Sequence, residues 1–476
     1  MNVDTPARHV VVIGGGIAGL AAAHRLLASG LRVTLLEATD RVGGKLHSGE
    51  IEGVRVDLGA ESMLARRTEG TDLARAVGLG DRLEPPATAA SSVWTRDALR
   101  PMPKGHVMGV PGDPSALAGL LSPEGLARIE HEKDLAPAEL GDDVAVGAYV
   151  AERLGREVVD RLVEPLLGGV YAGDAYRISM RAAVPQLFEA ARTHASLLEG
   201  VRDIQTRAAA GQQAGGPVFM GIDGGIGTLP GAVADAVRAQ GGDIRTETPV
   251  LGLIRGATGW QIRTDRETLT ADGVVLAAPA WSASALLAAE SPVAATELGQ
   301  VEYASMALVT MAFRRSDVAG MPAGSGFLVP PVDGRTIKAS TFSSHKWGWV
   351  ARGAGDLFVL RTSVGRYGEE EALEREDAEL VDVSLTDLAA AVGLTARPVA
   401  TEVTRWTGGL PQYPVGHLTR VARIRDEIAE LPGLRVCGAV YDGVGIPACI
   451  ASGQRAADEI LATPTLARGT DRDAGQ

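Results

Sequence analysis

A loop near the start of the chain has the residue types and spacing that hold a dinucleotide. It follows the apolar run at residues 10–13 and opens an apolar-periodic segment at 17–28, so it joins a predicted strand to a predicted helix. Its glycines permit a tight turn, close approach of a pyrophosphate to the backbone and close helix–strand packing, while the helix N-terminus attracts phosphates. The loop residues are Gly14, Gly15, Gly16, Ile17, Ala18 and Gly19.

A carboxylate at the end of the next predicted strand completes the dinucleotide signature. Glu37 follows the apolar run 31–36, where its side chain can accept hydrogen bonds from the ribose hydroxyls of an adenosine. Its charge would repel the 2′-phosphate of NADP, and the neighbouring Ala38 belongs to the same predicted site. A glycine turn without a ligand is the plain structural alternative, which this strand, loop and helix context disfavours.

A second glycine pair favours FAD over NAD as the nucleotide. Arg41, Gly44, Lys45 and Ser48 form the pattern Arg-x-Gly-Gly-Lys-x-x-Ser, which is typical of flavin oxidoreductases. The glycines let the backbone lie against the pyrophosphate, and the two cations add positive charge. A separate NAD(P)H site would need another fingerprint. The candidate at 225–231 has the wrong spacing and no following acid, which indicates a glycine-rich helix entry instead.

The composition excludes several classes of protein. The chain has 476 residues, 45% of them apolar, which predicts a globular protein, and its net charge of −13 argues against a nucleic acid partner. Cys437 and Cys449 are too few for a disulfide framework and are interpreted as small buried hydrophobes, and the eight histidines show no ligand spacing, so we predict no metal site. No apolar run reaches the ~20 residues of a membrane span, which leaves at most peripheral membrane contact and favours a cytoplasmic location.

The order of the predicted elements indicates an α/β protein with interleaved domains. A Rossmann-like FAD-binding domain is interrupted by a mixed-sheet substrate-binding domain and by a helical insertion that faces the substrate or a membrane. The FAD-binding domain is predicted at 1–92, 218–284 and 405–463, the helical insertion at 93–217, the substrate-binding domain at 285–404 and a disordered tail at 464–476.

Within these domains, hydrophobic periodicity predicts individual elements. A helix face at 150–166 and a second helix at 179–203 precede a small, polar segment at 207–216 that is interpreted as a mobile surface loop. The remaining predictions are helices at 228–240, 369–393 and 448–461 and strands at 273–279, 301–315, 326–330, 337–342, 357–364 and 434–438.

Several longer motifs resemble one family over nearly the whole chain. The segment 57–62 reads Asp-Leu-Gly-Ala-Glu-Ser, the segment 169–174 reads Gly-Val-Tyr-Ala-Gly-Asp, and 406–417 reads Trp-Thr-Gly-Gly-Leu-Pro-Gln-Tyr-Pro-Val-Gly-His. These are similar to blocks of the protoporphyrinogen and coproporphyrinogen III oxidases within the flavin-containing amine oxidase superfamily. The chain most resembles the soluble coproporphyrinogen III oxidases of Gram-positive bacteria, with Ala60 in place of the usual proline.

The resemblance implies a reaction in haem biosynthesis. FAD would oxidise coproporphyrinogen III to coproporphyrin III by repeated hydride transfer to flavin N5, with oxygen as the final acceptor and hydrogen peroxide as by-product. Protoporphyrinogen IX is the alternative substrate, and a ferrochelatase is a possible downstream partner. The protein could also be another flavin amine oxidase or a desaturase, although the lack of a lysine at 301–315 counts against amine oxidation. A third alternative is a flavin-binding protein that delivers or senses porphyrin without turnover.

The resemblance also assigns residues to the site. The Gly169 carbonyl would accept pyrrole N–H groups, and Leu328 and Phe342 would pack on the macrocycle, with plain core packing as the alternative for both. Arg100, Lys104 and His106 are candidates for the substrate propionates, although each alone could be a solvated surface charge. No catalytic base is assigned, and Glu61 is given a cofactor-side or structural role. The remaining cofactor residues are Gly59, Ala60, Glu61, Ser62, Val250, Trp406, Gly438, Val444, Gly445 and Ile446.

Overall fold

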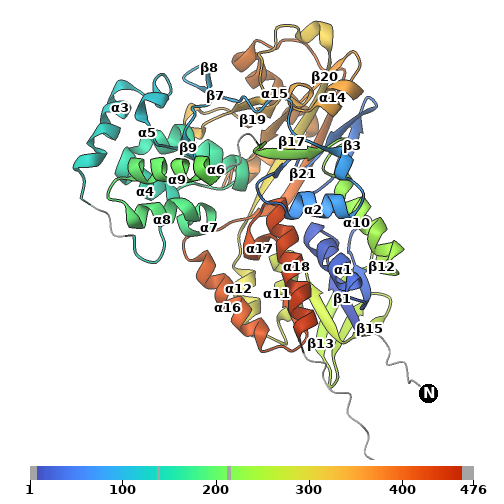
Figure 1. Cartoon of the computed structure of the whole chain (residues 1–476). Helices are drawn as coiled ribbons and strands as arrows, with labels where there is room; N and C mark the ends of the chain where they lie inside the picture. The colour runs from blue at the N-terminus through green and yellow to red at the C-terminus, as the bar shows by residue number, and fades with distance from the viewer. Residues whose placement is uncertain (1–7, 137–139, 212–215, 464–476) are drawn as a thin grey trace, which may run out of the picture.

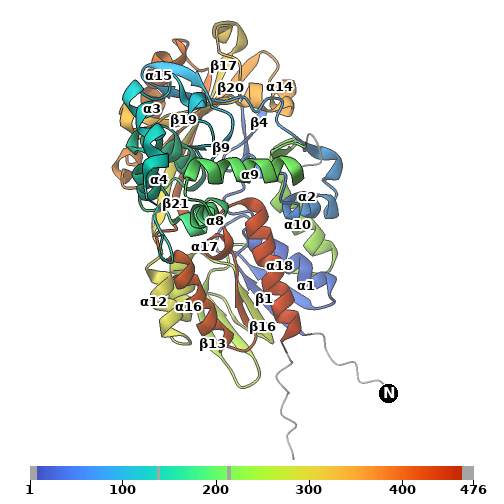
Figure 2. The same cartoon turned by 60° about the vertical axis from the view of Figure 1, so that its left-hand side comes forward.

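The computed structural model describes residues 8–136, 140–211 and 216–463. The chain forms three regions: a parallel sheet covered by helices, a larger mixed sheet, and a group of helices beside it (Figures 1 and 2). The predicted disordered tail at 464–476 lies outside the described residues. No helix in the described ranges is long and apolar enough to cross a bilayer.

The parallel sheet is the Rossmann-like unit that the sequence predicts. Its strand order is β12-β2-β1-β16-β22, so segments from the start, middle and end of the chain meet in one sheet. Along β1, Val10 and Val12 face one core cluster while Val11 and Ile13 face another, which explains why the strand is apolar at every position. The strands are β1 (His9–Ile13), β2 (Arg32–Leu36), β12 (Asp243–Arg245), β16 (Gly273–Leu276) and β22 (Leu434–Val436).

Helices cover both faces of this sheet. One face carries helices whose apolar sides share a cluster with Val10 and Val12, and the other face carries helices that pack with Val11 and Ile13. The first group is α1 (Ile17–Ala28), α10 (Thr228–Ala239) and α18 (Ile446–Ala462), and the second is α11 (Ala280–Leu287), α12 (Pro292–Gly299) and α16 (His417–Ala429).

The mixed sheet has the strand order β21-β17-β20-β19-β18-β7-β8, and β18 and β7 are its parallel pair. Helix α15 (Asp377–Val392) covers one face through a cluster that includes Phe313, Leu360 and Leu388. The opposite face of the mixed sheet faces the FAD-binding region and the helical region. The strands are β7 (Ser92–Thr95), β8 (Ala98–Pro101), β17 (Tyr303–Arg314), β18 (Gly326–Leu328), β19 (Ile337–Thr341), β20 (Leu357–Val364) and β21 (Ala400–Pro411).

Strands β7 and β8 differ from the sequence prediction, which placed residues from 93 onward in a helical insertion. Val93 and Trp94 are both buried, on opposite faces of the strand, because the helical core lies on one side of the sheet and the α15 cluster on the other. Strand β21 likewise crosses the predicted boundary at 404–405. The domain boundaries themselves stay predictions.

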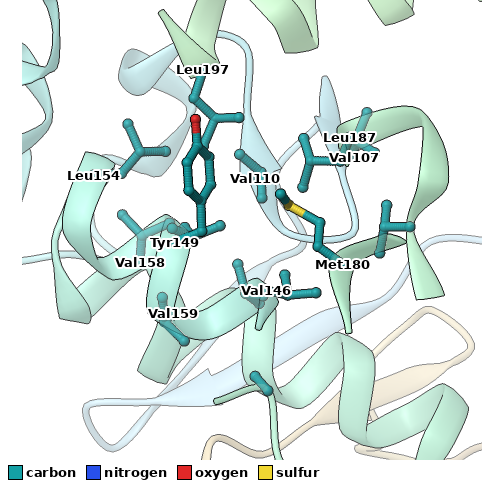
Figure 3. Packing of buried hydrophobic residues seen from close by; sticks show 14 of the residues in the cluster. Val107, Val110, Val146, Tyr149, Leu154, Val158, Val159, Met180, Leu187 and Leu197 are labelled. Atoms are coloured by element: carbon teal, nitrogen blue, oxygen red, sulfur yellow. The ribbon is translucent and has the colours of Figure 1, made fainter. Parts of the chain in front are cut away.

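The helical region packs around its own apolar core, which Figure 3 shows from close by. The predicted continuous helix face at 150–166 is wrong, because Gly155 adopts φ +96° and separates α4 from a short α5, a π-helical turn and α6. The predicted helix at 179–203 is also divided, and α9 extends to Gly211, so residues 207–211 of the predicted loop are helical. The helices are α3 (Pro123–Glu130), α4 (Val146–Leu154), α5 (Arg156–Val158), the π-helical turn (Val159–Val163), α6 (Glu164–Tyr171), α7 (Met180–Ala183), α8 (Pro185–Thr193) and α9 (Leu197–Gly211).

Smaller elements connect the three regions. A hairpin follows the second glycine pair, a three-stranded antiparallel sheet extends the FAD-binding region, and short helices lie between longer strands. They are β3 (Ser48–Ile51), β4 (Val54–Asp57), β5 (Met63–Leu64), β6 (Leu83–Glu84), β9 (His106–Val107), β10 (Val110–Pro111), β11 (Phe219–Ile222), β13 (Val250–Arg255), β14 (Trp260–Thr264), β15 (Thr268–Ala271), α2 (Glu69–Ala76), α13 (Ser343–Lys346), α14 (Gly348–Gly353) and α17 (Ala439–Asp442).

Candidate active site

In the loop between β1 and α1, some glycines are required by the fold and another leaves space for a ligand. Gly14 has φ +108°, and a Cβ there would lie 2.6 Å from the Ala277 carbonyl oxygen, so the fold itself requires glycine. A Cβ at Gly19 would lie 2.0 Å from the Gly14 carbonyl oxygen. Gly16, in contrast, precedes α1 with φ −66° and ψ 171°, and a Cβ there would meet no protein atom within 4 Å. Gly16 therefore faces open space at a helix N-terminus, as a phosphate site requires.

Glu37 lies at the end of β2, directly against this loop. Its carboxylate accepts hydrogen bonds from the backbone N–H groups of Gly15 (2.7 Å) and Thr39 (2.9 Å). Its carbonyl oxygen accepts the N–H of Thr248 at 2.8 Å, which brings the start of β13, with the predicted residue Val250, beside the same strand end. The structure thus brings Glu37, Ala38 and Val250 to one end of the parallel sheet.

The second glycine pair lies against the first loop. The N–H of Gly43 donates to the Gly15 carbonyl oxygen at 2.8 Å, and a Cβ at Gly44 would have the Gly16 Cα, 3.6 Å away, as its nearest neighbour. Arg41 turns back on its own loop, where its guanidinium donates to the Gly44 carbonyl oxygen at 2.8 Å. Lys45 is exposed, yet surrounding protein atoms lower the pKa of its ammonium group, as expected of a side chain in an enclosed, water-accessible space.

The segment 57–62 joins this loop to the rest of the fold. Buried Asp57 accepts the N–H groups of Ile226 and Gly227, both at 2.9 Å, and burial raises its pKa to about 6. The glycine-rich segment 225–231 therefore docks on a carboxylate as a helix entry. A Cβ at Gly59 would lie 2.1 Å from the Lys45 carbonyl oxygen, so the two glycine motifs touch. Ala60 and Ser62 flank Glu61 in the same segment.

Glu61 forms a buried cluster with two cations that sequence reasoning did not connect to it. Its carboxylate pairs with Lys346 on α13 and, at 3.1 Å, with Arg361 on β20. Arg361 also donates to the carbonyl oxygens of Asp57 (3.1 Å) and Gly59 (2.9 Å). Burial alone would raise the pKa of Glu61, but the two cations outweigh it and hold the pKa at about 2. The cluster locks the 57–62 segment onto the mixed sheet, which supports the structural role expected for Glu61.

We expect Arg361→Met to destabilise the protein by about 2–3 kcal/mol near neutral pH, because it removes an ion pair from a buried carboxylate and charged hydrogen bonds from two carbonyl oxygens. Because the folded pKa of Glu61 lies below its ordinary value, the stabilisation is present above that ordinary value and is lost as pH falls toward about 2. Urea unfolding at about pH 7 and about pH 4 should show the variant less stable at both pH values but losing less stability between them, because the folded pKa of Glu61 rises when Arg361 is removed.

Arg352→Met is the matched control, because Arg352 is 60% exposed in its pairs with Glu84 and Asp223. This substitution should lower the free energy of unfolding by less than about 1 kcal/mol. Equal losses in the two variants would contradict the importance of the Glu61 cluster.

The closing segment of the chain, which leads into α18, also contains glycines that face open space. Gly445 precedes α18, and its Cβ would have one atom at 4.0 Å as its nearest neighbour, while a Cβ at Gly438 would meet nothing within 4 Å. Helices α1 and α18 lie side by side (Figure 2), and a Cβ at Gly453 would lie 2.0 Å from the Ala18 carbonyl oxygen. Ile17 and Ile446, the first residues of α1 and α18, belong to one core cluster, whereas Val444 packs against the core of the helical region.

Trp406 on β21 packs against the 57–62 segment. Its indole N–H donates to the Leu58 carbonyl oxygen at 2.8 Å, and its ring lies 3.3 Å from where a Cβ of Gly59 would be. Four glycines therefore present bare backbone to open space: Gly16, Gly44, Gly438 and Gly445. Side chains at these positions would occupy the space that a bound cofactor needs. These residues fit a dinucleotide such as FAD, with phosphates at the N-terminus of α1.

The two cysteines near this space are inert. Cys437 and Cys449 are buried, and burial raises the pKa of both thiols, to about 12 for Cys449. They behave as the small buried hydrophobes that the sequence predicts. The described ranges contain no group of side chains that could hold a metal ion.

The structure brings two of the predicted substrate residues together. A Cβ at Gly169, on α6, would lie 3.8 Å from Leu328 Cδ2 on β18. Leu328 pairs with Ala339, which pairs in turn with Ser363, so these three side chains share one face of the mixed sheet. None of the three is fully buried although they lie within the sheet, so this face borders open space beside α6.

Phe342 is not part of that surface. Its side chain is 2% exposed and packs with Phe327 and Phe358 in the cluster beneath α15, on the other face of the sheet. The core-packing alternative therefore describes Phe342, and the predicted contact with a macrocycle has no exposed ring face here.

The three predicted propionate residues have different surroundings. Arg100 on β8 pairs with Val93, which is in register with Leu328, so Arg100 shares the face of Leu328 at the sheet edge. Its Nε is buried without a hydrogen-bond partner among the described residues. Lys104 is exposed in the turn before β9, and the Nδ1 of His106 accepts the Gly109 N–H at 3.1 Å. Of the three, Arg100 is best placed for a ligand.

Glu164 is a candidate site residue that sequence reasoning missed. It begins α6, and its Oε1 lies 3.7 Å from where a Cβ of Gly168 would be, next to Gly169. Burial raises the pKa of Glu164 to about 7, and burial lowers the pKa of Lys338 on β19 to about 8. The sequence signal was the spacing of Glu164 from Gly168, which puts the carboxylate on the helix face that the glycine leaves bare.

The chain is similar to known flavoproteins over most of its length. Residues 17–461 match the model of the family described as flavin containing amine oxidoreductase. The chain belongs to this family. The predicted flavin cofactor, FAD, and the predicted oxidoreductase class are thereby confirmed, as is the α/β fold class.

Individual relatives cover nearly the whole chain. A coproporphyrinogen III oxidase of Mycobacterium leprae is 37% identical over 463 residues, which are 96% of this chain and 99% of that protein. One of Bacillus subtilis is 34% identical, over 95% of this chain and 98% of that protein. A solved structure from Exiguobacterium, described as a candidate protoporphyrinogen oxidase, has a TM-score of 0.85 at 33% identity, covering 96% of this chain and 99% of that one. These relatives confirm the predicted resemblance to the porphyrinogen oxidases.

Proposed function

We propose that this protein is an FAD-dependent coproporphyrinogen III oxidase that uses oxygen as the final acceptor and works in haem biosynthesis. Two observations carry the proposal: the bare glycine backbone at the N-terminal ends of α1 and α18, and the approach of Gly169 on α6 to Leu328 on β18. The names of the relatives at 34–37% identity supply the substrate class. Protoporphyrinogen IX is the second candidate substrate, because a protoporphyrinogen oxidase of Bos taurus is 31% identical over 96% of this chain and 99% of that protein.

The residues of the chain would bind and orient the substrate. Bound FAD supplies the hydride acceptor. The carbonyl of Gly169 accepts a pyrrole N–H, and Leu328 and Ala339 provide an apolar surface that excludes water from the macrocycle face. Arg100, at the edge of the same sheet face, meets a propionate at the mouth of the site. The product then passes to an enzyme that inserts a metal, such as a ferrochelatase, and the protein works in the cytoplasm with at most peripheral membrane contact.

The test is anaerobic mixing of the flavin-loaded protein with freshly reduced coproporphyrinogen III, with protoporphyrinogen IX run in parallel. We expect flavin absorbance to bleach at least about tenfold faster with the first, because a site that pairs with four propionates discriminates against a substrate that carries only two. Benzylamine is the control donor, since amine oxidation predicts bleaching with it. A flavin that neither porphyrinogen bleaches would refute the proposal, and faster bleaching by protoporphyrinogen IX would reassign the substrate.

A further inference from the structure

Glu164 is a half-buried carboxylate with no hydrogen-bond or ion-pair partner among the described residues. It begins α6, but the chain is already helical through the preceding π-helical turn, so Glu164 caps no free helix end. Its Oε1 and Oε2 lie 3.7 and 3.9 Å from where a Cβ of Gly168 would be. The carboxylate therefore lies along the bare glycine face that leads to Gly169.

Two cations face Glu164 from the mixed sheet. Lys338 on β19 has an Nζ that is buried without a hydrogen-bond partner among the described residues. Arg366, just after β20, is held by backbone, since it donates to the carbonyl oxygens of Val329 (3.3 Å), Ile337 (3.2 Å) and Arg335 (3.0 Å). The register of β19 against β20 shifts between Ile337 and Ala339, and this bulge interrupts the alternation of side chains. Lys338 can therefore face Glu164 while its neighbour Ala339 pairs with Leu328, on the sheet face that Gly169 approaches.

Burial and nearby charges act in opposite directions on the pKa of Glu164. Burial favours the neutral acid, and so do Asp160 on the π-helical turn and Asp174 after α6. Arg366 and Lys338 favour the ionised form, and the resulting pKa of Glu164 is about 7. A carboxyl group with a pKa near neutrality can both accept and release a proton during turnover.

We propose that Glu164 accepts a pyrrole N–H proton that the porphyrinogen loses when hydride leaves a neighbouring methylene bridge, an inference that rests on the proposed function. Bound FAD would supply the two-electron oxidant, taking the hydrogen of a substrate methylene C–H bond with both of its electrons as hydride. The cation that remains loses one N–H proton to the Glu164 carboxylate, and the N–H electron pair completes the new double bond. Glu164 then releases the proton to water, which reaches its half-exposed side chain.

The decisive variant is Glu164→Gln, studied in the flavin-loaded protein by anaerobic single-turnover reduction with coproporphyrinogen III. We expect the flavin reduction rate to fall about 100-fold, because proton acceptors contribute on this order to catalysis. Binding of coproporphyrin III, followed by its fluorescence, should change less than about twofold, since a glutamine keeps the shape of the site. Glu152→Gln, at an exposed position on α4, is the matched control and should match the wild type in both measurements.

The pH profile separates proton acceptance from a structural role. The wild-type reduction rate should rise with pH through about 7 as Glu164 ionises, and the residual rate of Glu164→Gln should be flat. Lys338→Met should move the midpoint to higher pH, because loss of the nearby cation raises the pKa of Glu164. Glu164→Asp keeps the carboxylate, so its reduction rate should be lower but should retain the pH dependence. This variant replaces Glu164→Gln in the test if the glutamine variant does not fold.

A spectroscopic readout is independent of turnover. In flavin-free protein, difference infrared spectra should show the C=O band of a protonated carboxylic acid disappearing through about pH 7 in the wild type, with that component absent in Glu164→Gln. A wild-type rate and pH profile in Glu164→Gln, beside normal bleaching of the wild type, would overturn this inference alone. A wild-type flavin that neither porphyrinogen bleaches would overturn the proposed function and this inference with it.

Discussion

Replacing Gly16 by valine should lower the affinity for FAD by about a thousandfold, or about 4 kcal/mol, while the flavin-free protein keeps its stability. The backbone at Gly16 has φ −66° and ψ 171°, which any residue can adopt, and a Cβ there meets no protein atom within 4 Å. The new side chain would therefore collide with the cofactor phosphates at the N-terminus of α1 and with nothing else. Fluorescence titration of flavin-free protein with FAD measures the affinity, and thermal unfolding without flavin measures the stability.

Two further variants make this result specific. Gly16→Ala should give a smaller loss of affinity in the same direction. Gly231→Ala, on α10, also adds a Cβ to open space, and it should leave FAD affinity unchanged while stabilising the helix by up to about 1 kcal/mol. Wild-type FAD affinity in Gly16→Val would show that the phosphates lie elsewhere.

Replacing Glu132 by alanine should destabilise the protein by about 3–5 kcal/mol, because it leaves a buried guanidinium without its counter-ion. Glu132 and Arg153 are 0% and 2% exposed, and their ion pair measures 2.7 Å. The carboxylate also accepts the N–H of Leu197 at 2.7 Å, and Arg153 donates to the carbonyl oxygen of Ala195 at 2.8 Å. The pair thus holds the start of α9 to α4 inside the helical core. Chemical denaturation, monitored by circular dichroism, measures the change in unfolding free energy.

The control for Glu132→Ala is a surface pair on a helix. Asp72 and Arg75 on α2 are 59% and 58% exposed at 2.9 Å, so Asp72→Ala should cost less than about 1 kcal/mol. The double variant Glu132→Ala/Arg153→Ala should lose less than the sum of the two single variants, because each single variant strands a buried charge. Additive losses would show that the pair is not coupled.

The helical region shows where periodicity misleads. Residues 150–166 have one apolar face at helical spacing, yet Gly155 adopts φ +96° and divides the helix, because α4 and the following segments pack in different directions on the same core. Phe342 is a similar case, since a strand end allows a side chain to lie on either face and the cluster beneath α15 decides which. Neither outcome is encoded in a short window of sequence.

The sequence by itself determined the dinucleotide-binding half of this protein. The loop at 14–19, Glu37 and the second glycine pair are local patterns whose strand, turn and helix follow from glycine conformation and apolar spacing over some forty residues. The structure has the predicted strands and helix, and the Gly43 N–H donates to the Gly15 carbonyl oxygen while Gly44 lies next to Gly16.

Only the tertiary structure decided how titratable groups meet. Glu61 pairs with Lys346 and Arg361, and Lys338 acts on the charge of Glu164 without pairing with it, across long stretches of intervening chain. Such contacts depend on which strands become neighbours in the mixed sheet, and strand order is set by burial summed over the whole domain and not by local spacing. The same long-range packing sets the dielectric around each group, so protonation, and with it the proposed role of Glu164, follows from the fold.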